Sequence, residues 1–228
     1  MDKIIIRGRA TDEGLKISED EAGGFHFLEQ KWEFPKDTES ILLIGDHNLS
    51  YLDLRELSKC TNLRKFIIRD LGYDMRISLY HLNKCTKLEV LDVSGQGVYS
   101  VAFPPTTTIK RIDLSDNDIQ VIDLQPLSGC TDLAELNLKG NRLGHIDLKP
   151  LSSCTKLKKL NLASNQLESI DFDPLRTHTE LELLNIGVNP SLKGVDLTPL
   201  KSCRKLTILV DYMTPLLNDT SKEMVGRD

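Results

Sequence analysis

Residues 131–178 read TDLAELNLKGNRLGHIDLKPLSSCTKLKKLNLASNQLESIDFDPLRTH, and the second half of this stretch repeats the first. Leu133 recurs as Leu157 and Asn141 recurs as Asn165, so the period is 24 residues. A fixed period of this length is typical of a repeat array, in which each repeat is buried by its neighbours. We therefore expect one elongated domain rather than two globular ones.

Both copies follow the pattern L-x-x-L-x-L-x-x-N-x-L, and related versions of it extend over roughly residues 38–210. This pattern resembles the leucine-rich-repeat family. The resemblance implies an α/β fold, a curved solenoid with a parallel β-sheet on its concave face. Short helices, 3-10 turns and loops are then expected on the convex face. The resemblance also implies a role in protein recognition and supplies no reaction.

The repeats need a cover at each end, because a terminal repeat would otherwise expose an apolar flank. We predict an N-terminal cap of short strands over residues 1–38, about seven repeats over 39–203, and a C-terminal cap and tail over 204–228. Strands are expected in the cap at residues 3–8, 14–18 and 25–30, with Trp32 as an anchor. After Cys203, Leu206 and Leu209 begin another strand.

The first three repeats depart from the regular pattern that begins at residue 109. We place Leu42 and Ile44 at buried ladder positions of the first repeat. In the third repeat, Gln96 stands where later repeats have asparagine. Pro104 and Pro105 exclude a regular helix there, so its convex side is expected to be extended.

Charge and composition narrow the classes of partner. The net charge of −5 argues against a general nucleic-acid binder, which needs a basic face. No stretch approaches the ~20 apolar residues that span a bilayer, and no secretory signal is evident. We therefore predict a cytoplasmic protein with a protein partner, no nucleic acid, no membrane span and no cofactor, as a monomer or weak homodimer.

The five cysteines mark one phase of the repeat, shortly before the first leucine of the next one. They are Cys60, Cys85, Cys130, Cys154 and Cys203. We interpret them as small buried side chains that pack where the chain turns into the next strand. The alternative is a column of metal ligands completed by His178, but stacked repeats do not bring four such ligands to one point.

Two further rows of polar residues recur. Asn117, Asn141, Asn165 and Asn189 form an asparagine ladder, which we expect to satisfy buried backbone groups at the turn after each strand. The second row is Asp123, Asp147, Asp171 and Asp196, each three residues before a proline. We predict that these carboxylates accept backbone N–H bonds at the start of a short helix. The alternative, a row of calcium ligands, needs six to eight oxygens around one point.

The side chains between the ladder leucines point outward from the concave sheet, because side chains alternate along a strand. Their charges are mixed, as in many specific protein interfaces. We predict that the partner-binding residues are Lys65, Ile67, Arg69, Asp92, Arg111, Asp113, Asp116, Glu135, Asn137, Lys139, Lys159, Asn161 and Asn185. No catalytic or metal-binding residue is predicted.

At the amino-terminal end of this sheet, Ile41, Leu43 and Ile67 are expected to form an outward apolar patch. It is either an anchor for the partner or the seat of the cap. Residues 12–39 are acidic, and this charge is either a solvated cap surface or a docking site for a basic partner.

Two other functions remain open. Asp92 and Asp113 occupy equivalent positions of successive strands, so they form the one candidate for a hydrolase-like site. No serine, histidine and aspartate arrangement, phosphate-binding loop or HExxH motif supports catalysis. A narrower form of the binding hypothesis is a targeting or regulatory subunit of a GTPase, a phosphatase or a ubiquitin-type enzyme.

Overall fold

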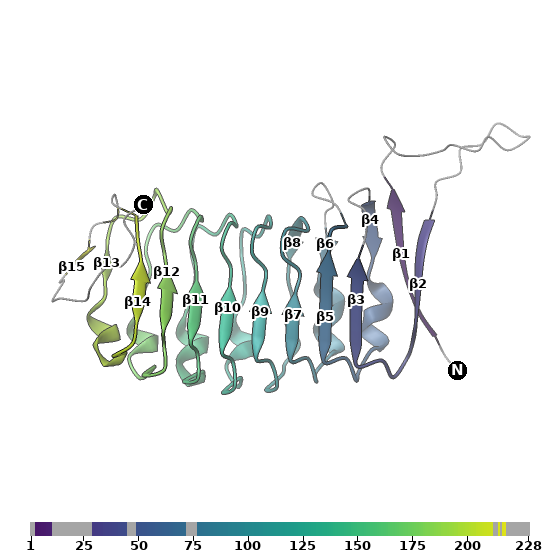
Figure 1. Cartoon of the computed structure of the whole chain (residues 1–228), viewed down its shortest axis with the longest axis horizontal. Helices are drawn as coiled ribbons and strands as arrows, with labels where there is room; N and C mark the ends of the chain where they lie inside the picture. The colour runs from purple at the N-terminus through teal and green to yellow at the C-terminus, as the bar shows by residue number, and fades with distance from the viewer. Residues whose placement is uncertain are drawn as a thin grey trace, which may run out of the picture.

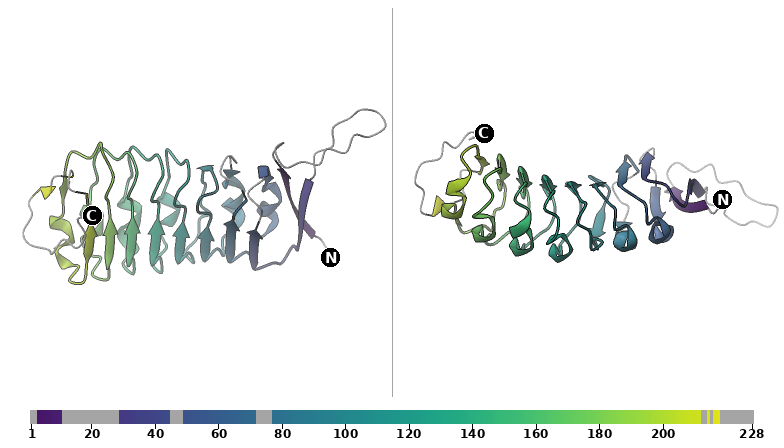
Figure 2. Two further views of the ribbon diagram at one scale, coloured as in Figure 1. Left: turned by 45° about the horizontal axis from the view of Figure 1, so that its top comes forward. Right: turned by 90° about the horizontal axis from the view of Figure 1, so that it is seen from below.

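The structure is a computed structural model that describes residues 3–10, 29–44, 49–71, 77–211, 214 and 216–217. Within these ranges, one strand from each repeat joins an eight-stranded parallel sheet (Figure 1). In spatial order the strands are β3 (Ser40–Ile44), β5 (Lys65–Arg69), β7 (Val90–Asp92), β9 (Arg111–Asp113), β10 (Glu135–Asn137), β11 (Lys159–Asn161), β12 (Leu183–Asn185) and β14 (Thr207–Leu209). The stack bends with this sheet on its inner side, as the right-hand view in Figure 2, seen from below, shows. The predicted solenoid is confirmed.

The core is a single column of apolar side chains that runs the length of the sheet. The central residues Ile112, Leu136 and Leu160 are fully buried and lie in register on β9, β10 and β11. Complete burial of such a side chain contributes about 1.5–3 kcal/mol. Because each repeat buries its leucines only against its neighbours, the sheet and the core form together.

Short 3-10 helices follow the strands on the convex side. They are η2 (Arg55–Lys59), η3 (Tyr80–Lys84), η4 (Gln125–Leu127), η5 (Lys149–Ser153), η6 (Asp173–Leu175) and η7 (Thr198–Ser202). Asp147 Oδ1 accepts the backbone N–H of Lys149 at 2.9 Å, and the equivalent aspartates of the other regular repeats do the same. The predicted capping role is confirmed. The aspartate stands one position before the residue that directly precedes the helix, which is Leu148 for η5. Residues 101–110 form no helix, as Pro104 and Pro105 predict.

The asparagine ladder is also confirmed. Asn165 is buried, and its Nδ2 donates to the carbonyl oxygens of Leu138 and Leu162 at 2.9 and 3.1 Å. Its Oδ1 accepts the backbone N–H of Leu143 at 3.1 Å. Each asparagine therefore serves the repeat before it as well as its own, which ties neighbouring repeats together.

The amino-terminal strands β1 (Lys3–Ala10) and β2 (Glu29–Pro35) form an antiparallel hairpin. β1 also pairs with β4 (Leu49–Asp53), on the flank of the first repeat, while β3 is hydrogen-bonded to β5. Trp32 is partly buried against the core, as expected. The expected strand at residues 14–18 lies outside the described residues.

Smaller parallel pairs lie on the same flank farther along the stack. They join β6 (Ile77–Ser78) to β8 (Val98–Ser100), and β13 (Val195–Asp196) to β15 (Leu216–Leu217).

The predicted phase of the first repeat is wrong by one residue. Ile41 and Leu43 are fully buried, whereas Leu42 and Ile44 are 51% and 58% exposed. All four residues are apolar, so alternation does not choose between the two phases. The spacing to the flank misleads as well, because Ile41 lies twelve positions before Asp53, against eleven between Leu136 and Asp147.

A second slip occurs at the last strand, where Ile208 and not Leu209 pairs with Leu184 in the core. The loop between Cys203 and Ile208 is one residue shorter than the loop between Cys154 and Leu160. Leu209 consequently faces outward beside Asn185.

Candidate functional site

The concave face carries its outward side chains in two straight rows. Strand pairing places in register Lys65, Val90, Arg111, Glu135, Lys159 and Leu183 in one row, and Ile67, Asp92, Asp113, Asn137, Asn161 and Asn185 in the other. Arg69, Lys139 and Asp116 lie just beyond these strands or at their ends. The structure therefore brings all the predicted partner-binding residues to one face; that they bind a partner stays a prediction.

Arg69 and Asp92 form the tightest charge pair of this face. Arg69 Nη1 donates to Asp92 Oδ1 at 2.7 Å, and Nη2 donates to Oδ2 of the same carboxylate. Asp92 is only 6% exposed, and its hydrogen bonds raise the pKa of Arg69. A two-pronged pair of this kind fixes both side chains, so Arg69 offers a rigid guanidinium edge rather than a freely moving charge.

Asp113, the register partner of Asp92 on the next strand, accepts hydrogen bonds from neighbouring residues. Its Oδ1 accepts from Ser115 N at 3.1 Å, from Ser115 Oγ at 2.7 Å and from Asn137 Nδ2 at 3.1 Å. Arg111 lies 3.5 Å from Asp113 Oδ2 and 3.7 Å from Glu135 Oε2. Both carboxylates of the hydrolase hypothesis are thus engaged with cations or donors.

Asn137, Asn161 and Asn185 also have a structural role, which the sequence pattern does not predict. Each Oδ1 accepts the backbone N–H two residues later, at 3.2 Å in all three cases. An asparagine at the end of a strand commonly turns back on its own backbone in this way. These side chains shape the strand ends, and their half-buried amides form the floor of the face.

Three lysines are the free charges of the concave face. Lys65, Lys139 and Lys159 are exposed and make no ion pair with any residue that the structure describes. Asp116 is also exposed, and its backbone has φ 55°, a left-handed conformation that its position in the turn requires. The face thus combines cations that form no ion pair among the described residues with the Arg69–Asp92 pair.

An apolar patch lies at the amino-terminal end of the same face. Leu42 and Ile44 project from β3 beside the half-buried Ile67 of β5. This patch replaces the predicted set of Ile41, Leu43 and Ile67. Both β3 side chains stay more than half exposed, so the β1–β2 hairpin does not bury them.

The five cysteines and His178 form a buried column on the convex side. The Cys130 thiol donates to the Thr106 carbonyl at 3.0 Å and the Cys203 thiol to the His178 carbonyl at 2.7 Å. Burial raises the pKa of Cys60 to about 11 and that of Cys85 to about 12, so these thiols are neutral. All five are free and buried, which matches the packing interpretation.

His178 takes the cysteine phase in its own repeat and is fully buried. Its Nε2 lies 3.1 Å from the Leu151 carbonyl oxygen, while Nδ1 has no partner in the described structure. Burial lowers the pKa of this imidazole. Among the described residues, no cluster of three histidine, cysteine or carboxylate side chains is placed to hold a metal ion.

Comparisons with known proteins agree with this architecture. Residues 107–167 match the sequence profile of the family described as leucine rich repeat. No curated protein sequence matches the chain.

Among solved structures, the chain is similar to the internalin InlF of Listeria monocytogenes, with a TM-score of 0.50, 22% identity, and coverage of 73% of this chain and 59% of that one. It is also similar to the functional domain of InlJ from the same organism, described as including a cysteine ladder, with a TM-score of 0.50, 21% identity and coverage of 76% and 43%. The chain spans less than two thirds of either structure, and the likeness concerns the fold alone. No helix among the described residues has the length and apolar content needed to cross a membrane.

Proposed function

We propose that this leucine-rich-repeat protein binds another protein through the concave face of its sheet. The observation that supports it is the set of side chains on this face, among which Lys65, Lys139 and Lys159 lack ion-pair partners within the described ranges. A rigid sheet holds these charges at fixed spacings. A partner with complementary charges is selected by register, which is how electrostatics gives specificity.

The apolar patch of Leu42, Ile44 and Ile67 adds affinity to this specificity. Exposed apolar patches next to polar surface mark interaction sites in soluble proteins. Burying one such side chain against a partner contributes up to about 1.5–3 kcal/mol. The patch and the lysines lie on the same sheet, so one extended partner surface can cover both.

The Asp92 and Asp113 pair does not support a hydrolytic function. A general acid or nucleophile needs a carboxylate that can reach substrate. Asp92 is buried against Arg69, and Asp113 is bonded to Ser115 and Asn137. We therefore assign both residues to the shape and charge of the binding face.

The test is affinity capture from the native cell extract with three versions of the chain. One is wild type, one carries Lys65→Glu, Lys139→Glu and Lys159→Glu on the concave face, and one carries Lys84→Glu, Lys149→Glu and Lys193→Glu elsewhere. The two triple variants change the net charge equally. We expect the partner to be lost with the concave variant and retained with the control, with both variants folded by circular dichroism.

Equal retention by all three versions would overturn the proposal. The identity of the captured protein then tests the narrower proposal that the chain is a targeting or regulatory subunit of a GTPase, a phosphatase or a ubiquitin-type enzyme.

The contribution of the patch is measured separately with Leu42→Ser/Ile44→Ser. Both side chains are more than half exposed, so the variant is expected to fold. We expect its affinity for the captured partner to fall by about tenfold or more. An unchanged affinity would show that the patch lies outside the interface. The proposal would then rest on Lys65, Lys139 and Lys159.

A further inference from the structure

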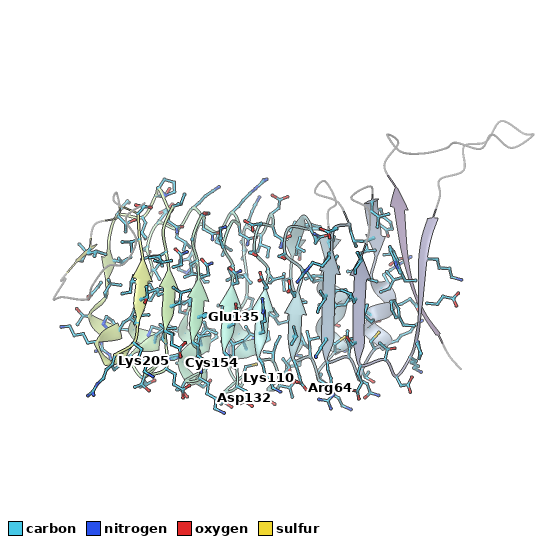
Figure 3. All side chains as sticks on the ribbon, viewed as in Figure 1. Arg64, Lys110, Asp132, Glu135, Cys154 and Lys205 are labelled. Carbon is cyan, nitrogen blue, oxygen red and sulfur yellow. The ribbon has the colours of Figure 1, made fainter. Side chains whose placement is uncertain are left out.

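Ion pairs connect neighbouring repeats along the edge of the solenoid where the loops enter the strands. Arg64 lies 3.5 Å from Glu39 and 2.5 Å from Glu89, and Lys110 lies 2.8 Å from Glu89. The hydrogen bonds from Lys110 and Arg64 lower the pKa of Glu89. Figure 3 shows Arg64 and Lys110 along this edge, with Lys205 at its far end. Arg64 and Lys110 are thus neutralised by the protein itself, and Lys87 of the same edge donates to Asn62 Oδ1 at 2.7 Å.

The carboxyl-terminal end of the same edge is different, because it holds a hollow of about 750 Å³. The charged side chains that line the hollow are Lys158, Glu180, Glu182, Lys201, Arg204 and Lys205. They come from three successive repeats, and η7 supplies Lys201. Four cations therefore surround two carboxylates, in a chain whose net charge is −5.

The cations of the hollow are not neutralised as they are elsewhere on the edge. Lys158 lies 3.9 Å from Glu182, at the limit of an ion pair. Lys201, Arg204 and Lys205 are exposed and form no ion pair with the described residues. These three cations lie around one hollow, so their positive potentials add there. An anionic group that enters the hollow is therefore attracted by all three.

We propose that this basic hollow binds an acidic segment of a protein partner, whose carboxylates lie against Lys201, Arg204 and Lys205. Arginine and lysine beside a concavity form charge-assisted hydrogen bonds with carboxylates. Glu180 and Glu182 lie in the same hollow and repel a continuous run of phosphates, whereas a peptide places its carboxylates at intervals. This site is separate from the concave lysine rows and stands or falls independently of them.

The test uses the full chain and a fluorescein-labelled peptide of alternating glutamate and glycine, titrated at low salt by fluorescence anisotropy. Arg204→Glu/Lys205→Glu removes two cations from the hollow. Lys84→Glu/Lys149→Glu makes the same charge change on the convex side. Glu180→Gln/Glu182→Gln removes the two repelling carboxylates. Thermal unfolding followed by circular dichroism verifies that each variant is folded.

We expect the hollow variant to bind the peptide about tenfold more weakly than wild type, and the convex control to bind within about twofold. The glutamine variant is expected to bind more tightly than wild type. The proposal is overturned if wild type does not bind the peptide or if the hollow and control variants bind it equally. It is also overturned if a labelled oligothymidylate binds wild type more tightly than the peptide does, since the hollow would then favour a phosphate backbone.

Discussion

The regular repeats, residues 109–203, and the irregular repeats, residues 39–108, find acceptors for the backbone N–H groups of their turns by different means. In the regular repeats, Leu143 N–H donates to the side chain of Asn165 in the following repeat. In the irregular repeats, Leu71 N–H donates to Gln96 Oε1, and Leu49 N–H donates to the backbone carbonyl of Leu71. The fold thus requires that each turn find an acceptor in the next repeat, and asparagine is one way to supply it.

The largest effect is expected when a regular repeat receives the residue that the second repeat has at Leu71. Asn165→Leu leaves Leu143 N–H and the carbonyls of Leu138 and Leu162 without the bonds that Asn165 makes. Each buried group without a partner costs about 1–3 kcal/mol, so we expect a loss of about 3 kcal/mol or more in the free energy of unfolding. Urea denaturation followed by circular dichroism measures it.

The matched control is Gln166→Leu, at the exposed neighbouring position, and we expect it to change stability by less than about 0.5 kcal/mol. Equal stabilities of the two variants would show that the ladder does not carry the backbone bonding of the regular repeats.

A smaller effect is expected at the left-handed position that follows each strand. Gly140 has φ +66°, and an added Cβ there would lie 2.2 Å from Asp116 Oδ1 and 3.2 Å from Asp116 Cα. We expect Gly140→Ala to destabilise by about 1–2 kcal/mol or more. Gly95 has the same φ with no atom near its Cβ direction, so Gly95→Ala measures the backbone effect alone. Thermal melts of both variants separate the clash from the backbone strain.

Val188 is the reverse case, because it holds φ 58° with a β-branched side chain that is 62% exposed. Its backbone N–H donates to Asp211 Oδ2 at 2.6 Å, a bond that glycine retains. We expect Val188→Gly to stabilise the chain by about 1 kcal/mol. A destabilised Val188→Gly would show that its side chain makes a contribution larger than the strain.

The smallest predicted effect concerns His178, which stands at the cysteine position of its repeat. It appears only at acid pH. Burial lowers the pKa of His178 from 6.5 in the folded chain, so the unfolded chain binds the proton more tightly. Both states are neutral above pH 6.5, and stability is lost as the pH falls from there toward the lowered pKa. His178→Cys is expected to lose less melting temperature between neutral and acid pH than wild type. Parallel losses in the two proteins would contradict this assignment.

The sequence predicts the regular repeats residue by residue, because one spacing recurs there, and Cys130, Cys154 and His178 each stand at the same distance before the central residue of β10, β11 and β12. The outward rows from Lys65 to Leu183 follow directly from that spacing. The first repeat has no cysteine at that distance before its strand. Residues 41–44 are all apolar, so the pattern does not show which of them are buried, and it predicts Leu42 and Ile44 in the core. The exposed patch of Leu42, Ile44 and Ile67 results from the extra residue before Asp53. The alternation of apolar and polar residues does not reveal that insertion.

The candidate site was predictable as a face but not as a set of bonds. Asp92, Asp113 and the asparagine row were expected to point outward, and they do. Which of them are engaged depends on side-chain geometry between strands, such as the contact of Asn137 Nδ2 with Asp113. The basic hollow was missed because its cations come from loops and η7 rather than from the repeated strand pattern.

Site-specific photocrosslinking tests whether the partner contacts the concave sheet. A photoreactive phenylalanine analogue replaces Lys159 on the concave face in one variant and Lys149 at the start of η5 on the convex face in another. We expect a crosslinked partner from position 159 and none from position 149. A crosslink from position 149 without one from position 159 would contradict it.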